Sequence, residues 1–154
     1  MQLADFLDCD AIKTALPGGN KRSLLQQLAN LAAQRLGIDA AAVLASLTER
    51  EQLGSTGFGL GVAIPHAKID GIEGVYGLFA RLGEPVDYKA IDGAPVDLVF
   101  LLLSPADAGA EHLKALAAIS RVTRDAATLE RLRGARSRDA LAAVLMGADE
   151  RDAA

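Results

Sequence analysis

Apolar residues recur at helical spacing over the first third of the chain. Asn20 can cap a helix whose apolar face continues to Leu36, and Gly37 stands where such a helix would end. Asp39 can cap a second helix that runs to about Leu53. The pattern therefore predicts two consecutive amphipathic helices.

The pattern becomes extended in the middle of the chain. Residues 58–67 are extended and interrupted by glycines, and residues 75–82 (VYGLFARL) combine β-branched and aromatic side chains. Residues 96–103 (VDLVFLLL) form a nearly continuous apolar run, which is typical of a central strand covered on both faces. Glycine, aspartate and proline turns separate these segments, which we interpret as strands of one sheet.

Helical spacing returns after the apolar run. We expect a helix over about 109–123, followed by shorter ones near 126–133 and 138–146, with Ser137 capping the last. This alternation predicts an α/β (α+β) fold with helices outside a sheet. A chain of 154 residues, 51% hydrophobic, suffices for one core and is short for two domains. We expect a single domain over 1–150 and a disordered tail over 151–154.

Charge and composition narrow the classes of function. The net charge of −4 disfavours nucleic acid as a partner, because such a partner needs a basic face. Four arginines are concentrated near the C-terminus: Arg131, Arg133, Arg136 and Arg138. We interpret them as a solvent-exposed face of the protein. The alternative is a binding surface for an acidic partner.

The sequence also indicates in which cellular compartment the protein is expected. It has no apolar run long enough to span a membrane, and its acidic beginning does not resemble a signal peptide, so we expect a cytoplasmic protein without membrane insertion. Cys9 is the one cysteine, so no internal disulfide can form. Its acidic neighbours would raise the pKa of its thiol, which makes it a weak nucleophile.

The clearest chemical signal is a glycine-rich segment, GSTGFGLGVAIPH, that ends in one of two histidines, His66. Such a loop can approach an anion closely, and Ser55, Thr56 and Gly57 offer hydroxyl and N–H donors for a phosphate. The segment lacks the motifs of ATP and NAD sites. An ordinary turn and an ordinary histidine remain the alternative.

Two further residues strengthen a phosphate hypothesis. His112 is expected in the first turn of the helix after the apolar run, where the helix dipole disfavours protonation and attracts anions. Arg50 falls on the helix stripe that faces the sheet, where burial is costly without an anion. A core histidine and a surface arginine at a helix end are the alternatives. Glu51 and Glu111 are polar neighbours.

Together these residues suggest that Nε2 of His66 attacks a phosphoryl group. Arg50, His112 and the loop hydroxyls would hold the non-bridging oxygens, a scheme that needs no metal and no cofactor. Two other classes of function stay open. A hydrolase or metal site would lack a recognisable third ligand, and a binding module would use the loop without covalent chemistry.

Four short motifs in this order resemble the enzyme IIA family of the bacterial phosphotransferase system, fructose and mannitol type: TERE (48–51), GSTG (54–57), GVAIPH (61–66) and EHL (111–113). The resemblance implies a mixed five-stranded sheet sandwiched by helices. It also implies that His66 accepts a phosphoryl group from a histidine phosphocarrier protein, as a tele-phosphohistidine. Arg50 and His112 would then support the phosphate, and the chain would be a phosphoryl carrier.

The segment 87–98 (DYKAIDGAPVDL) and the length look more like the nitrogen-regulatory branch than a sugar-permease module. That branch implies regulation of partners such as sensor kinases or potassium transport proteins. A sugar-specific enzyme IIA that passes phosphate to a permease IIB component is the alternative. Docking of a donor should need an exposed apolar rim around His66, for which Phe58, Leu60 and Val62 are candidates.

Overall fold

The structure is a computed structural model, and it describes residues 1–153. Its centre is a six-stranded sheet in the order β1-β5-β6-β3-β2, with β4 also paired to β6. The strands are β1 (Lys13–Leu16), β2 (Gly57–Gly59), β3 (Val62–Ala63), β4 (His66–Ile69), β5 (Tyr76–Val86) and β6 (Val96–Pro105). β5 runs antiparallel to β6, whereas β3 and β4 run parallel to it, so the sheet is mixed.

Strands β3 and β4 occupy one position in the sheet. Val62 of β3 is in register with Leu98 of β6, and His66 of β4 with Leu102. Pro65 lies between the two strands and has no N–H to donate, which interrupts the ladder. The sheet is therefore five strands wide, as the family resemblance implied, although it contains six segments.

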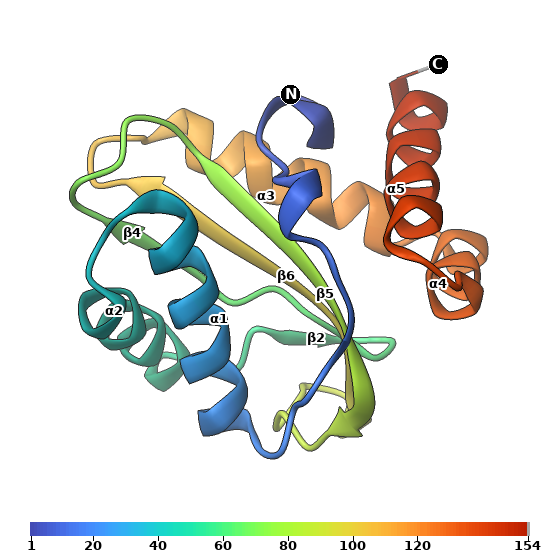
Figure 1. The fold of residues 1–154 in the computed structure, drawn as a ribbon, viewed down its shortest axis with the longest axis horizontal. Helices are drawn as coiled ribbons and strands as arrows, with labels where there is room; N and C mark the ends of the chain where they lie inside the picture. Colours follow the sequence, from blue (N-terminus) through green and yellow to red (C-terminus); the bar gives the residue numbers. More distant parts are fainter. Residues whose placement is uncertain (154) are drawn as a thin grey trace.

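The helices cover the two faces of the sheet (Figure 1). α1 (Lys21–Leu36) and α2 (Ala40–Gln52) pack on one face, and α3 (Ala110–Thr123), α4 (Ala126–Gly134) and α5 (Arg138–Ala153) on the other. The 3₁₀ turn η1 (Leu3–Asp5) joins the second group, whereas η2 (Cys9–Ala11) contacts both, with Ala11 in the first cluster and Cys9 packed against the second. None of the described helices is long and apolar enough to cross a membrane.

The predicted helix boundaries are largely confirmed. Asn20 accepts a hydrogen bond from the Ser23 N–H (2.8 Å), and Gly37 ends α1 in the left-handed region at φ 68°. Ser137 accepts one from the Ala140 N–H (3.0 Å) at the start of α5. That helix is longer than the predicted 138–146 and enters the expected tail, of which residue 154 lies outside the described residues.

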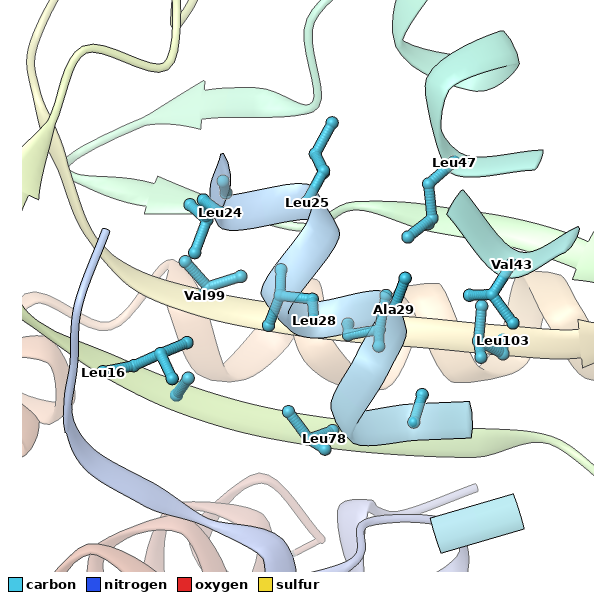
Figure 2. Packing of buried hydrophobic residues seen from close by; sticks show 14 of the residues in the cluster. Leu16, Leu24, Leu25, Leu28, Ala29, Val43, Leu47, Leu78, Val99 and Leu103 are labelled. Atoms are coloured by element: carbon cyan, nitrogen blue, oxygen red, sulfur yellow. The ribbon is translucent and has the colours of Figure 1, made fainter. Parts of the chain in front are cut away.

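The continuous apolar run is explained by burial on both faces. Val99, Leu101 and Leu103 of β6 face α1 and α2, and the intervening residues Phe100 and Leu102 face α3–α5. In Figure 2, Leu28 and Ala29 of α1 lie between Val99 and Leu103 of β6, and Val43 of α2 lies next to Leu103. Each fully buried leucine contributes roughly 1.5–3 kcal/mol of transfer free energy.

This architecture brings three chain segments together. α2 packs against β4 and ends one short loop before β2, while β6 leads through a turn into the N-terminus of α3. Because β4 and β6 are parallel, their carboxyl ends lie at the same edge as the start of α3. Open α/β sheets commonly place ligand sites at such an edge.

Candidate phosphoryl-acceptor site

Both histidines line one pocket of about 460 Å³. α2 and the residue after it contribute Ser46, Glu49, Arg50 and Leu53, β4 contributes His66, Ala67 and Lys68, and α3 contributes His112. The two imidazole rings lie 5.6 Å apart between centroids and are tilted by 49°. Each histidine is 8% exposed. The structure therefore brings together three of the residues that the sequence selected for chemistry: His66, His112 and Arg50.

The ring of His66 is held through Nδ1. This atom lies 2.6 Å from the carbonyl oxygen of Ile64. A carbonyl can only accept, so Nδ1 carries the proton and Nε2 keeps its lone pair. Burial, followed by the charge of Arg50, lowers the pKa of His66, against opposing contributions from the Ile64 bond and Glu51. His66 is therefore a neutral imidazole at pH 7 with a nucleophilic Nε2.

His112 stands in the first turn of α3, as predicted. Its Nδ1 lies 2.6 Å from the hydroxyl of Ser104 at the end of β6. Burial lowers the pKa of His112, and the nearby His66 and Lys68 act in the same direction. The second imidazole is thus also neutral, and Nε2 is the ring nitrogen left to face the pocket.

Two cations complete the pocket. Arg50 is half-buried in the last turn of α2 and donates from Nη1 to the carbonyl of Gly54 (3.0 Å). This bond anchors the guanidinium, whose other N–H groups can serve an anion. Lys68 is exposed and stands two residues after His66 in β4, on the same face of the strand. Glu49 also lines the pocket, so its carboxylate offsets one of the two cations. The remaining positive charge and the two neutral imidazoles allow the pocket to bind a phosphoryl group.

The loop hydroxyls are used elsewhere, contrary to the expectation for Ser55, Thr56 and Gly57. Among the described residues, none of the three lines the histidine pocket. The fully buried Thr56 donates from Oγ1 to Glu51 (2.6 Å), lies 3.0 Å from the hydroxyl of Tyr88, and donates its N–H to Glu51 (3.1 Å). The Ser55 hydroxyl accepts from the Gly57 N–H (3.1 Å). These groups fix the loop.

The two glutamates near the histidines have different surroundings. Glu51 is half-buried, with its side chain 7% exposed, and forms an ion pair with Lys21 (3.0 Å), whose Nζ lies 4.4 Å from the centroid of the Tyr88 ring. Glu111 is exposed and pairs with Lys114 (3.4 Å). Glu51 thus belongs to the loop's internal network, and neither glutamate lines the histidine pocket.

The apolar rim also differs from the expectation. Val62 is buried, while Phe58 and Leu60 are exposed but do not line the histidine pocket. Leu53, at the end of α2, lines the histidine pocket and is exposed, and Leu113, which follows His112 in the chain, is exposed as well. Leu53 is 82% exposed and Leu113 is 67% exposed, so exposed apolar side chains stand at the end of α2 and in the first turn of α3.

Other candidates from the sequence have structural roles. Arg133 of the basic concentration pairs with Asp97 (2.8 Å), and Arg138 donates to the carbonyl of Asp10 (3.1 Å). Burial and two neighbouring aspartates raise the pKa of the Cys9 thiol. No three potential metal-ligating side chains gather within the part of the chain that the structure describes. The histidine pocket is therefore the candidate site.

Comparison with known proteins decides the family. The profile of the family described as "Phosphoenolpyruvate-dependent sugar phosphotransferase system, EIIA 2" matches residues 5–147. The chain belongs to this EIIA family. A solved EIIA structure, "Nitrogen Regulatory Protein IIA-Ntr" from Neisseria meningitidis, superposes with a TM-score of 0.87 at 35% identity, covering 93% of this chain and 98% of that one.

Several EIIA relatives carry a regulatory name. A nitrogen regulatory protein of Bradyrhizobium diazoefficiens is 48% identical over 145 residues, which are 94% of this chain and 95% of that protein. The nitrogen regulatory protein of Escherichia coli is 36% identical over 143 residues, covering 92% and 87%. A fructose-specific EIIA component of Haloferax volcanii is 37% identical over 130 residues, 84% of each chain.

Proposed function

We propose that His66 accepts a phosphoryl group at Nε2 from a histidine phosphocarrier protein. The observation that carries the proposal is the 2.6 Å hydrogen bond from Nδ1 to the carbonyl of Ile64, which leaves the Nε2 lone pair free in a pocket with Arg50 and Lys68. A neutral imidazole with its proton held away from the reacting atom is suited to nucleophilic attack.

In the proposed transfer, Nε2 forms a bond to phosphorus while the donor nitrogen leaves with the electron pair of its N–P bond. His66 keeps its Nδ1 proton, and the Ile64 carbonyl stabilises the positive charge that develops on the ring. Arg50, Lys68 and His112 hold the three non-bridging oxygens. Positioning and charge stabilisation are the main needs of phosphoryl transfer, so these side chains suffice for the step.

We further propose that phosphorylation regulates the binding of partner proteins, as in the nitrogen-regulatory branch. The 48% and 36% identical relatives with that name support this role. A phosphate adds roughly −1.5 to −2 charge, and it would do so in a pocket lined by the exposed Leu53 and by His112, whose neighbour in the chain is the exposed Leu113. A partner that docks on these leucines would therefore distinguish the two forms. The family description names phosphoenolpyruvate, a cytoplasmic metabolite, as the source of the phosphate, and this supports the proposal that the protein acts in the cytoplasm.

The first test is direct labelling. The purified chain is incubated with phosphoramidate, a small donor that phosphorylates histidine, and in parallel with a phosphorylated histidine phosphocarrier protein. We expect the intact mass to rise by about 80 Da, the mass of one phosphoryl group. His66→Ala should abolish the increase, and His112→Ala should slow it. Undiminished labelling of His66→Ala would refute the acceptor assignment.

Transfer of phosphate to a sugar permease is the second candidate, favoured by the 37% identical fructose-specific component. The phosphorylated chain is mixed with a purified fructose-specific IIB component, and loss of the added mass is followed. Rapid transfer to IIB would support the sugar role. Retention of the phosphate on His66 would support the regulatory role.

A further inference from the structure

A buried serine contacts the second histidine of the pocket. Ser104 follows the apolar run of β6, is fully buried (0% exposed), and lies in register with Lys68 of β4. Its hydroxyl lies 2.6 Å from Nδ1 of His112. Within the described residues, this is the hydrogen bond that serves the Ser104 hydroxyl.

Burial decides the direction of this hydrogen bond. If Nδ1 of His112 carried the proton, the Ser104 hydroxyl would accept, and its own hydrogen would have no acceptor in a fully buried position. Buried donors without acceptors are strongly disfavoured. If the hydroxyl donates to Nδ1, both groups are satisfied and the proton of the neutral imidazole resides on Nε2.

We propose that Ser104 is a positioning residue that holds His112 in the Nε2–H tautomer, so that His112 donates a hydrogen bond to the phosphoryl group bound at His66. This inference rests on the proposed function. The two imidazoles then have opposite tautomers for a physical reason: the Ile64 carbonyl forces Nδ1 of His66 to donate, and the Ser104 hydroxyl makes Nδ1 of His112 accept.

The opposite tautomers have complementary tasks. His66 presents a lone pair to phosphorus, and His112 presents an N–H to a phosphoryl oxygen. With the other tautomer, His112 would turn a lone pair toward that oxygen, and the two would repel each other. The same Ser104 bond also fixes the rotation of the ring, so the N–H is already oriented before the phosphate arrives.

Nitrogen NMR tests the tautomers without any phosphate. The chain has two histidines, so long-range ¹H–¹⁵N spectra of the labelled protein at pH 8 contain two ring systems. We expect Nε2 protonated and Nδ1 unprotonated in His112, and the reverse in His66. A protonated Nδ1 in wild-type His112 would overturn the proposal, whether or not the chain accepts phosphate.

Variants then test the link to transfer. In Ser104→Ala, the His112 nitrogens should shift toward an average of the two tautomers, while His66, an internal control in the same spectrum, stays unchanged. Phosphorylation of His66 by phosphoramidate should slow by about three- to tenfold, the scale of one hydrogen bond. Ser104→Thr, which keeps the hydroxyl, should retain the His112 tautomer, and Ser120→Ala on α3 is the matched control without effect.

A double-variant comparison separates positioning from structural damage. In a His112→Ala background, Ser104→Ala should cause no further slowing, because Ser104 acts through His112. An unchanged His112 spectrum in Ser104→Ala, or equal slowing with and without His112, would overturn the inference. Failure of the wild type to accept phosphate with the expected tautomers present would instead count against the proposed function alone.

Discussion

Arg50 and Glu51 are neighbours in the last turn of α2, yet they belong to two polar clusters of opposite character. The closed cluster contains Lys21, Glu51, Thr56 and Tyr88, whose polar groups bind one another. The open cluster contains Arg50, His66, Lys68 and His112, which line the pocket. Polar groups that satisfy one another stabilise the fold, whereas those that share a pocket without mutual ion pairs are available to a ligand.

The closed cluster acts as a support for the open one. Glu51 accepts from both the N–H and the hydroxyl of Thr56, which fixes the loop directly after α2. Burial, and then the charge of Glu51, raises the pKa of Tyr88, so its hydroxyl stays protonated at any physiological pH. The end of α2 is thereby held in place, and with it Arg50 beside the histidines.

The largest expected effect comes from breaking the closed cluster. Glu51→Ala removes the acceptor of Lys21 and of Thr56 and leaves a half-buried cation and a buried hydroxyl without their partner. We expect the free energy of unfolding in urea to fall by about 2–3 kcal/mol, less than for a fully buried ion pair because Lys21 keeps partial contact with water. Glu49→Ala, an exposed position on the same helix, is the matched control and should change it by less than about 0.5 kcal/mol.

Arg50→Ala should reduce the rate of phosphorylation much more than it reduces stability. Its guanidinium is half-buried and makes one hydrogen bond, to Gly54, so we expect a small change in stability. The rate of phosphorylation at His66 should fall by about 10- to 100-fold, because a charged hydrogen bond to the phosphoryl oxygens is lost. The rate is followed by intact mass, with Arg50→Lys recovering part of it. An unaltered phosphorylation rate in Arg50→Ala would contradict the proposal that Arg50 binds the phosphoryl group.

Thr56→Val tests the difference between the closed and open clusters at a residue that the sequence predicted to bind phosphate. The isosteric change deprives Glu51 and Tyr88 of a partner in a fully buried position, so urea unfolding should show a loss of about 1–2 kcal/mol. The phosphorylation rate should stay within about twofold of wild type, because Thr56 does not line the pocket. A much slower phosphorylation rate with an unchanged free energy of unfolding would indicate that Thr56 contacts the phosphate.

Sequence reasoning predicted which residues lie around the pocket better than it predicted their contacts. Helix caps and the apolar run predicted α1, α2 and β6, and the histidines and Arg50 were selected correctly as neighbours. The four-residue β1 was missed, because its pattern is mostly exposed and lacks an apolar signature. Thr56 lies outside the pocket because its hydroxyl is bound by Glu51, five residues earlier, and contacts Tyr88, 32 residues later; the sequence alone does not show that the fold brings both side chains onto this hydroxyl.

Lys68 and Ser104 were overlooked for related reasons. Lys68 could have been predicted from the sequence, because alternate residues of a strand point to the same face and Lys68 stands two residues after His66 in β4. Ser104 gave no such signal, because its role depends on the turn that brings α3 back over β6. Local patterns therefore reveal which donors and nucleophiles a chain has, and the tertiary fold determines which of them remain free.

The smallest expected effect concerns pH. Burial, and then the charge of Arg50, lowers the pKa of His66, so the neutral nucleophile persists to a lower pH than in a free histidine, whose pKa is about 6.5. Between pH 8 and 6.5 the phosphorylation rate with phosphoramidate should fall by less than about twofold, and it should decline only as pH drops further. NMR titration of the ring measures the same quantity directly. Arg50→Ala should move the inflection upward, because a neighbouring positive charge is removed. An inflection at or above pH 6.5 in the wild type would show that His66 is not held neutral by its pocket.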